Sequence, residues 1–204
     1  AVAAKTANFG YVDVPTMMRA AVKGAPIVAT GVLLQTSPMS AMGFVEKNIK
    51  KPEDIKGKTV AITPADSMTQ IWPLFLKKTG LKESDFQTVA GDGQTKLNAV
   101  INGQADLLLG YVMDQSMKIK DATGKDVHAI KFADYGINMV CSGVVANTEF
   151  VKATADLVKR FMSATTKAVE AAEKDAKGAA QSILDANPKG GKIETLTQGF
   201  ELTI

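Results

Sequence analysis

This chain has few of the residues that disulfides, metal sites and most catalytic sites require. It holds one cysteine, Cys141, and one histidine, His128, among 204 residues. A single cysteine excludes an intramolecular disulfide, and a lone histidine can neither build a metal cage nor act as a base without a partner. We interpret Cys141 as a small buried hydrophobe and His128 as an ordinary strand residue, and we expect no catalytic group, metal or cofactor.

Long apolar runs and a strong charge excess are also missing. No stretch of about eighteen apolar residues occurs, and the first residues do not combine a basic region with an apolar core. The sequence therefore predicts neither a transmembrane helix nor a signal peptide within these residues. The net charge is only +3 and comes from scattered lysines, which indicates no nucleic-acid partner and no anionic membrane surface.

The motifs of nucleotide-binding and hydrolytic sites are absent as well. The chain has no GxxxxGK[ST], GxGxxG or GxSxG pattern, and the two glycines of Gly91-Asp92-Gly93 indicate a turn. Residues 1–12 resemble the end of a helix, a turn and a strand without a capping signal, and residues 197–204 stop without finishing an element. We expect a fragment of a longer protein.

From Thr59 onward, short apolar strands alternate with helices of about ten residues. Strands are predicted at 59–63, 85–89, 106–110 and 127–131, and helices at 67–79, 94–102 and 113–120. Such alternation is typical of βαβ units around a parallel sheet, so we predict an α/β fold. Earlier strands are predicted at 9–12, 26–35 and 39–45, with a helix after Pro15.

Two segments interrupt this pattern and divide the predicted fold into two lobes. Residues 46–58 are rich in lysine and contain Pro52, and Asp134-Tyr135-Gly136 separates the alternating region from an apolar strand at 137–146. Helices follow after Asn147 or Thr148 and at 177–186. We assign residues 1–50 and 136–204 to an incomplete lobe 1 and residues 51–135 to lobe 2, with crossovers near 46–56 and 132–137.

Polar residues follow several predicted strands and are the candidates for a binding site. In open α/β sheets, ligands bind beyond the carboxyl ends of strands, and the turn before the helix at 67–79 also points free backbone N–H groups outward. The candidate ligand-binding residues are Tyr11, Asp13, Ser37, Asp66, Ser67, Met68, Thr69, Gly110, Tyr111, Asp114 and Tyr135.

Several of these candidates have a structural alternative. Asp13, Ser67 and Thr69 can cap helices. Pro73 favours a late start for its helix, which would make Thr69 the cap and leave Asp66 and Ser67 free. Trp72 is better explained by packing than by ligand stacking.

Several segments resemble the solute-binding proteins of bacterial ABC importers. They are VAAKTANFGYV at 2–12, KGAPIVA at 23–29, SP at 37–38, KPEDIKGKTVAI at 51–62 and LNAVINGQAD at 97–106. The branch is the one serving nitrate, sulfonates and taurine, and the pyrimidine precursors of thiamine. The resemblance implies a type II periplasmic-binding-protein fold, in which two α/β lobes hold a ligand between them and close by hinge motion.

The same resemblance implies a small-molecule solute, an ABC permease as partner, no catalysis and a monomer. It implies a periplasmic location, or an extracytoplasmic one as a membrane-tethered lipoprotein, and an N-terminal strand and helix before Ala1. The candidate loops hold no arginine or lysine but carry Asp13, Asp66 and Asp114. Carboxylates repel anions, so the residues favour a donor-bearing heterocycle of the pyrimidine type over a sulfonate or nitrate.

Two other functions share parts of this pattern. The effector-sensing domain of a LysR-type transcription regulator has the same two-lobed architecture. A pyrimidine synthase related to these binding proteins would require an active-site histidine and a cysteine-rich loop, which one histidine and one cysteine do not supply.

Overall fold

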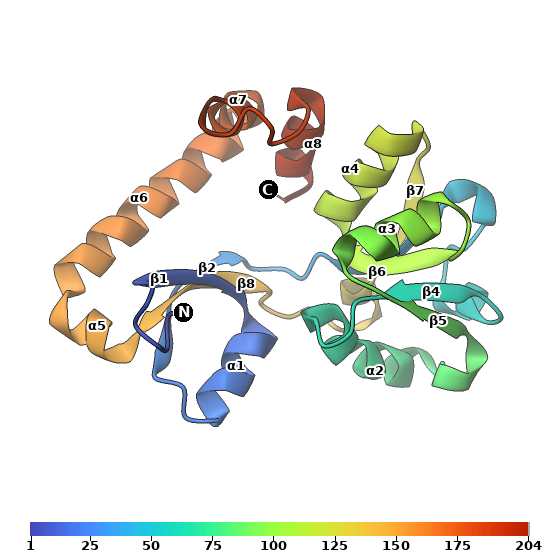
Figure 1. Ribbon diagram of the computed structural model, residues 1–204, viewed down its shortest axis with the longest axis horizontal. Helices are drawn as coiled ribbons and strands as arrows, with labels where there is room; N and C mark the ends of the chain where they lie inside the picture. Colours follow the sequence, from blue (N-terminus) through green and yellow to red (C-terminus); the bar gives the residue numbers. More distant parts are fainter. Residues whose placement is uncertain (204) are drawn as a thin grey trace.

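The computed structural model describes residues 1–203 and contains two β-sheets with helices around them (Figure 1). The strands are β1 (Phe9–Asp13), β2 (Ile27–Leu34), β3 (Met39–Phe44), β4 (Thr59–Ile62), β5 (Gln87–Ala90), β6 (Leu107–Tyr111), β7 (Val127–Lys131) and β8 (Ser142–Asn147). The helices are α1 (Val14–Val22), α2 (Ser67–Thr79), α3 (Gly93–Ile101), α4 (Val112–Thr123), α5 (Thr148–Ala153), α6 (Ala155–Lys174), α7 (Ala176–Ala186) and α8 (Ile193–Thr203). The chain is therefore an α/β protein, as the alternating pattern predicts.

The larger sheet has the strand order β5-β4-β6-β3-β7 and forms lobe 2. β4 pairs in parallel with β5 and β6, whereas β3 is antiparallel to β6 and β7. This arrangement brings the carboxyl ends of β4, β5 and β6 to the same end of the sheet as the start of β3. Polar turns that follow these strands consequently lie close together.

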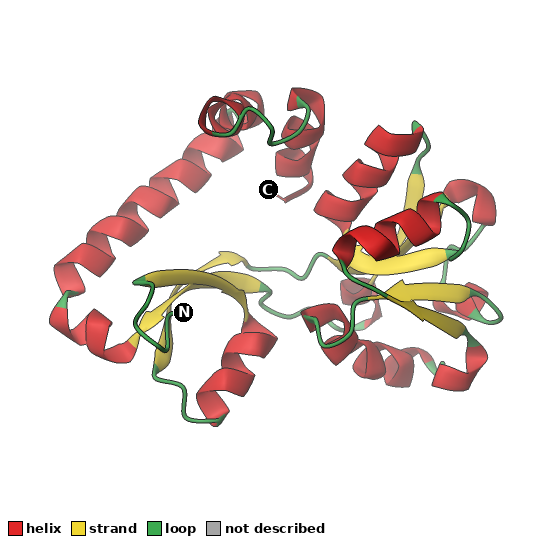
Figure 2. Ribbon diagram, in the orientation of Figure 1, coloured by secondary structure: helices red, strands yellow, loops and turns green. Residues whose placement is uncertain are grey.

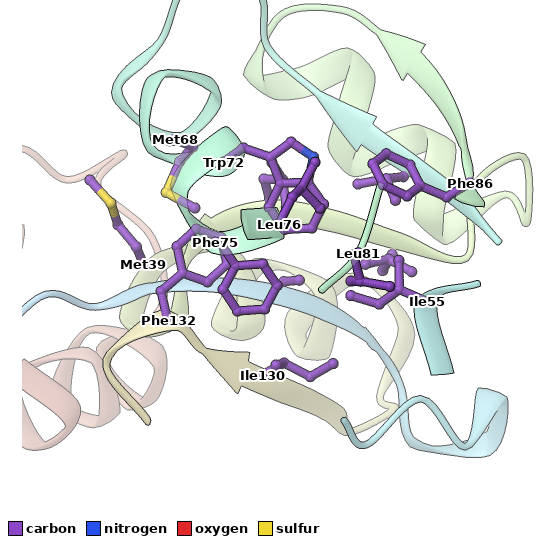
Figure 3. Close-up of a cluster of buried hydrophobic side chains, with 14 of the residues drawn as sticks. Met39, Ile55, Met68, Trp72, Phe75, Leu76, Leu81, Phe86, Ile130 and Phe132 are labelled. Atoms are coloured by element: carbon purple, nitrogen blue, oxygen red, sulfur yellow. The ribbon is translucent and has the colours of Figure 1, made fainter. Parts of the chain in front are cut away.

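Helices cover both faces of this sheet. Successive side chains of its strands point to opposite faces and join two separate apolar clusters. On one face, Trp72, Phe75 and Leu76 of α2 lie in a cluster with Phe132 (Figure 3). Val60 and Leu107 belong to the same cluster. On the other face, α3 and α4 supply a second cluster with Leu97, Val100, Leu108 and Ile119. A sheet buried on both faces explains why β6 reads as a continuous apolar run.

The smaller sheet has the order β1-β8-β2, with antiparallel pairing throughout, and forms lobe 1 together with α1, α5 and α6. Phe9 stacks on Phe161 of α6, with ring centroids 4.0 Å apart, and meets Phe150 of α5 edge to face. These aromatic contacts attach the C-terminal helices to the sheet.

Helix α8 joins the two lobes. It follows α7 along the chain, yet it lies beside α4 of lobe 2 (Figure 1). The Thr195 hydroxyl donates to Asp121 Oδ2 at 2.5 Å, and Lys192 Nζ lies 3.7 Å from Asp121 Oδ1. Residues 197–203 are helical and belong to α8.

The chain passes between the sheets at 35–38 and 136–141, and both passages are loops in Figure 2. The sequence prediction placed strand 39–45 in lobe 1 and the crossovers near 46–56 and 132–137. The observed pairing differs, because β3 joins β6 and β7 in lobe 2. Residues 46–58 instead connect β3 to β4 within lobe 2, and residues 132–135 form a short 3-10 helix there.

Helix α2 begins earlier than Pro73 suggests. Its first residue is Ser67, its N-cap is Asp66, and Pro73 lies inside the helix. The missing Pro73 N–H costs one backbone hydrogen bond. Burial of Trp72 and Phe75 on the same helix offsets that cost. Among residues 1–203, no helix is both long and apolar enough to cross a membrane.

Candidate ligand-binding site

Four hydroxyl groups from both lobes gather where the crossovers meet the strand ends. Tyr111 OH lies 3.4 Å from Ser67 Oγ within lobe 2, and Tyr11 OH lies 2.5 Å from Ser142 Oγ within lobe 1. The Cys141 thiol, adjacent in sequence to Ser142, donates to Tyr111 OH at 3.6 Å and links the two pairs. We call Tyr11, Ser67, Tyr111 and Ser142 the hydroxyl cluster.

Tyr111 and Cys141 are neutral groups in this cluster. Burial raises the pKa of the Tyr111 phenol strongly. The hydrogen bond with Ser67 lowers this pKa, and the neighbouring Cys141 thiol raises it. Burial also raises the pKa of the Cys141 thiol. Both side chains therefore keep their protons at neutral pH and can take part in hydrogen bonds without carrying charge.

The N-terminus of α2 contributes to the same region. Asp66 caps the helix, since its Oδ1 accepts from Thr69 N at 2.8 Å and from Thr69 Oγ1 at 3.0 Å. Ala65, just before the cap, has a positive φ of 63°. The predicted alternative that Thr69 is the cap, with Asp66 free, is wrong, because the Asp66 carboxylate accepts from the Thr69 N–H and is the N-cap of the helix. Ser67 keeps its hydroxyl for Tyr111.

A buried lysine lies beneath this helix end. Lys96 of α3 is 5% exposed; its Nζ donates to the Leu109 carbonyl at 2.7 Å and lies 3.7 Å from Asp66 Oδ2. Burial lowers the pKa of Lys96, and the Asp66 carboxylate opposes this shift. The Lys96 ammonium therefore compensates part of the negative charge of Asp66. The sequence analysis found no lysine or arginine in the candidate loops and did not consider Lys96 of α3. Lys96 lies on the buried face of that helix with Ala99 and Val100.

The turn from β6 into α4 holds Tyr111 in position. Gln115 Oε1 accepts from Tyr111 N at 2.7 Å, and Gln115 Nε2 donates to Asp114 Oδ2 at 2.6 Å. A Cβ at Gly110 would displace the end of the Gln115 side chain, so glycine at this position leaves room for the bond between Gln115 and Tyr111 N. Asp114 also pairs with Lys118 at 2.7 Å.

Asp13 lies on the lobe 1 side of the site, and Ser37 lies in the first crossover. Asp13 Oδ1 accepts from Thr16 N at 2.8 Å and caps α1. Its charge also raises the pKa of Tyr111 and Cys141, which places it near the cluster. Ser37 is buried, and its Oγ accepts from Met39 N at 3.4 Å.

Two predicted residues lie apart from the hydroxyl cluster. Met68 is buried in the apolar cluster under α2. Tyr135 packs edge to face on Phe75, whose ring lies in the same cluster. His128 lies toward the opposite end of β7, where its Nε2 is 3.2 Å from the Lys50 carbonyl oxygen. No group of three potential metal ligands occurs within the described residues.

Sequence reasoning missed Ser142, Gln115 and Lys96. Ser142 lies inside the strand that the sequence predicts at 137–146, whereas β8 begins at Ser142 in the structure, so the rule for strand ends did not select it. Gln115 looks like any exposed helix residue. Lys96 alone has a usable signal, because it occupies an apolar position of an amphipathic helix.

Comparisons with solved structures show a shared fold. The aliphatic sulphonate binding protein SsuA from Escherichia coli has a TM-score of 0.83 at 15% identity, over 100% of this chain and 68% of that one. The alkanesulfonate-binding protein SsuA from Xanthomonas axonopodis pv. citri, bound to MOPS, has a TM-score of 0.76 at 16% identity, over 100% and 68%. A putative sulfonate-binding protein from Methylobacillus flagellatus has a TM-score of 0.65 at 19% identity, over 90% and 55%.

A search of curated protein sequences finds no significant match. A comparison with protein families, in contrast, matches residues 1–179 to the family described as NMT1/THI5 like. The match covers most of the 204 residues, including both sheets and the hydroxyl cluster. This chain therefore belongs to the NMT1/THI5-like family.

Proposed function

We propose that this chain is the solute-binding component of a bacterial ABC importer and holds a small organic solute between its lobes. The observation that carries the proposal is the hydroxyl cluster, because its members come from both lobes and meet at the carboxyl ends of β4 and β6. This is where ligands bind in open α/β sheets. The family match supports the same function.

An unpaired polar atom at the end of β4 also supports a ligand. Within residues 1–203, the buried Thr63 Oγ1 has no hydrogen-bond partner, and Thr63 directly follows β4. A buried hydroxyl without a partner is costly unless a ligand or water satisfies it. Helices α2 and α4 both begin at this end of the sheet, so their N-terminal dipoles favour a ligand with acceptor atoms.

The charge of the site suits two classes of head group. Asp13 and Asp66 cap helices, and Asp66 faces Lys96, so these carboxylates repel an anion less than the sequence suggests. Hydroxyls can both donate and accept. We propose a head group rich in acceptors, either a pyrimidine-like heterocycle or a member of the sulfonate and nitrate class. The matched SsuA proteins are named for sulfonates.

The two crossovers at 35–38 and 136–141 are the proposed hinge. Two loops that connect rigid lobes can absorb the backbone rotations of domain closure. Closure would bring Tyr11 and Ser142 onto a solute held by Ser67 and Tyr111. The closed monomer would then deliver the solute to the membrane permease from the periplasm or another extracytoplasmic compartment.

Native mass spectrometry of the purified protein, followed by thermal shifts with sulfonates, nitrate and pyrimidines, tests this function. We expect one class to raise the melting temperature. Tyr111→Phe and Ser67→Ala should each weaken that ligand about fivefold or more through a lost hydrogen bond. Tyr135→Phe removes a hydroxyl outside the cluster and serves as the matched control. Equal weakening by all three variants, or turnover of the solute, would contradict the proposal.

The alternative of an effector-sensing domain of a LysR-type regulator has no specific observation in its favour. The family match instead points to the importer branch. The related enzyme is disfavoured because His128 lies away from the hydroxyl cluster and Cys141 is a buried, protonated thiol.

A further inference from the structure

Among the residues that the structure describes, Lys96 is the only buried side chain that carries a charge. It is the fourth residue of α3, which begins at Gly93 after the N-cap Asp92. The positive end of the helix dipole disfavours a cation in this first turn, and burial of an ammonium group is costly. Local rules would therefore favour an apolar residue at this position.

The Lys96 ammonium lies next to the two turns that carry the lobe 2 members of the hydroxyl cluster. Its Nζ donates to the Leu109 carbonyl at 2.7 Å, and Leu109 lies two residues before Tyr111. The same Nζ lies 3.7 Å from Asp66 Oδ2, and Asp66 directly precedes Ser67. One buried positive charge thus adjoins the backbone that positions both hydroxyls.

Few other charges act on the lobe 2 side of the site. Asp114 and Lys118 of α4 face Lys96 from a distance, but they pair with each other at 2.7 Å and are both more than 40% exposed, so solvent screens them. Asp13 belongs to lobe 1. The Asp66 side chain is only 26% exposed and that of Lys96 5%, and charges that are partly removed from water act more strongly on their surroundings.

We propose that Lys96 is a specificity-determining residue, which sets whether the site accepts an anionic or a neutral head group. This inference rests on the proposed function and assigns its choice of charge to one side chain. With Lys96 present, its pair with Asp66 is neutral overall, and the N-terminal dipoles of α2 and α4 favour negative charge. Without Lys96, the Asp66 carboxylate would be uncompensated and would repel an anion.

The pair can be dissected because the charge and the structural function of Asp66 are separable. Its Oδ1 accepts from Thr69 N, and asparagine is an equally good N-cap. Asp66→Asn should therefore preserve α2 and leave Lys96 without its counter-charge. Lys96→Met removes the ammonium group and keeps an apolar chain of similar length. The double variant removes both charges and has the charge balance of the wild type.

The probes are pairs of ligands that have nearly the same shape and differ by one negative charge. Methanesulfonate and methanesulfonamide represent the sulfonate class, and uracil-6-carboxylate and uracil-6-carboxamide represent the pyrimidine class. Isothermal titration calorimetry gives the Kd of each ligand. The Kd of the neutral ligand divided by that of the anion is the charge preference, and a general loss of folded protein cancels in this ratio.

The variants should change the charge preference in opposite directions. Lys96→Met should lower it about tenfold, which is the order expected when one charge is removed from a partly dehydrated site. Asp66→Asn should raise it by a similar factor. The double variant should return close to the wild-type ratio, because the two charges act on the ligand through the same electrostatic potential.

Two exposed residues provide the matched controls. Asp92→Asn makes the same substitution at the N-cap of α3, where Asp92 is exposed and its Oδ1 accepts from Thr95 N at 2.7 Å. Lys78→Met removes an exposed lysine of α2. Both variants should keep the charge preference of the wild type. Circular dichroism verifies the fold of every variant.

The outcomes separate this inference from the proposed function. If ligands bind but the ratio is the same in the wild type, Lys96→Met and Asp66→Asn, the inference is overturned and the solute-binding function stands. A lowered ratio in Lys96→Met that the double variant does not restore would show a structural effect and would also overturn it. If Lys96→Met does not fold, the opposite shift expected for Asp66→Asn decides. If neither pair binds to the wild type, the proposed head-group classes fail and the inference fails with them.

Discussion

The two lobes bury their apolar side chains to very different extents. Both apolar core clusters consist of residues between Met39 and Met139 and belong to the five-stranded sheet and its helices. Of the twelve large hydrophobic side chains that are exposed in the described residues, only Val45 and Leu74 belong to lobe 2. Lobe 2 therefore has the core of an independent folding unit. Within the described residues, lobe 1 has a narrower sheet and a few aromatic contacts.

The strongest test of this difference removes one large aromatic side chain from each lobe. Phe75 is fully buried and stacks on Trp72 and Phe132. Phe75→Ala should destabilise lobe 2 by about 3–5 kcal/mol through lost burial and a cavity. Phe161 stacks on Phe9 but is 39% exposed, so Phe161→Ala should cost only about 1 kcal/mol.

Urea denaturation provides the measurement. Fluorescence of Trp72, the only tryptophan, reports lobe 2, and far-UV circular dichroism reports the whole chain. Equal losses for Phe75→Ala and Phe161→Ala would show that the lobes share one core.

A smaller effect is expected from a close backbone contact in lobe 1. A Cβ at Gly143 of β8 would collide with the Gly31 carbonyl of β2. Gly143→Ala should therefore cost about 1–3 kcal/mol, because the strands must separate. Hydrogen exchange should become faster in β2 and β8 while the Trp72 transition stays in place. A shift of both transitions together would argue against separate lobes.

Lys96 predicts a pH dependence that is specific to lobe 2. Burial lowers the pKa of Lys96 in the folded chain, whereas an unfolded lysine titrates near 10.4. Between these two pKa values the unfolded chain binds more protons, so the stability of the wild type should rise with pH in that window.

Lys96→Met should remove this rise, because it removes the titrating group. Urea midpoints of wild type and variant from pH 8 to pH 10 provide the comparison. The exposed lysine variant Lys78→Met is the control and should follow the wild type. The same pH slope in Lys96→Met and wild type would contradict the role of burial.

The smallest effect concerns the contact between α8 and lobe 2. Thr195→Val removes the hydrogen bond to Asp121 at nearly constant volume and should cost about 0.5–1.5 kcal/mol. Hydrogen exchange within α8 should become faster, while the amides of α2 remain protected. If α8 exchange is unchanged, the bond does not hold α8 to lobe 2.

Most elements of the fold could be predicted because local patterns and the tertiary structure agree. Gly80 and Gly124 end α2 and α4 in left-handed conformations, as their positions indicate. The assignment of β3 failed, because pairing partners are set by contacts between residues far apart in the chain. β3 pairs with β6 about seventy residues later, and no local pattern of Met39–Phe44 specifies that partner.

The candidate site was partly predictable for a similar reason. Ser67 and Tyr111 follow strands, so the rule for strand ends selects them. Ser142 and Lys96 contribute through geometry that only the folded chain creates. Tyr135 also follows a strand, yet the short 3-10 helix at Phe132–Tyr135 turns it toward Phe75. The assignment of these residues to a ligand stays a prediction until the variants are measured.

The position of Cys141 makes the time scale of lobe motion measurable without introducing a reporter residue. It is the only thiol in the chain, it is fully buried, and it lies at the second crossover with its sulfur against Tyr111. Iodoacetamide can alkylate it only while the lobes are apart, so the alkylation rate records how often they separate. A bound solute that closes the lobes would slow this reaction in proportion to its occupancy, and Cys141 would then report binding through chemical kinetics.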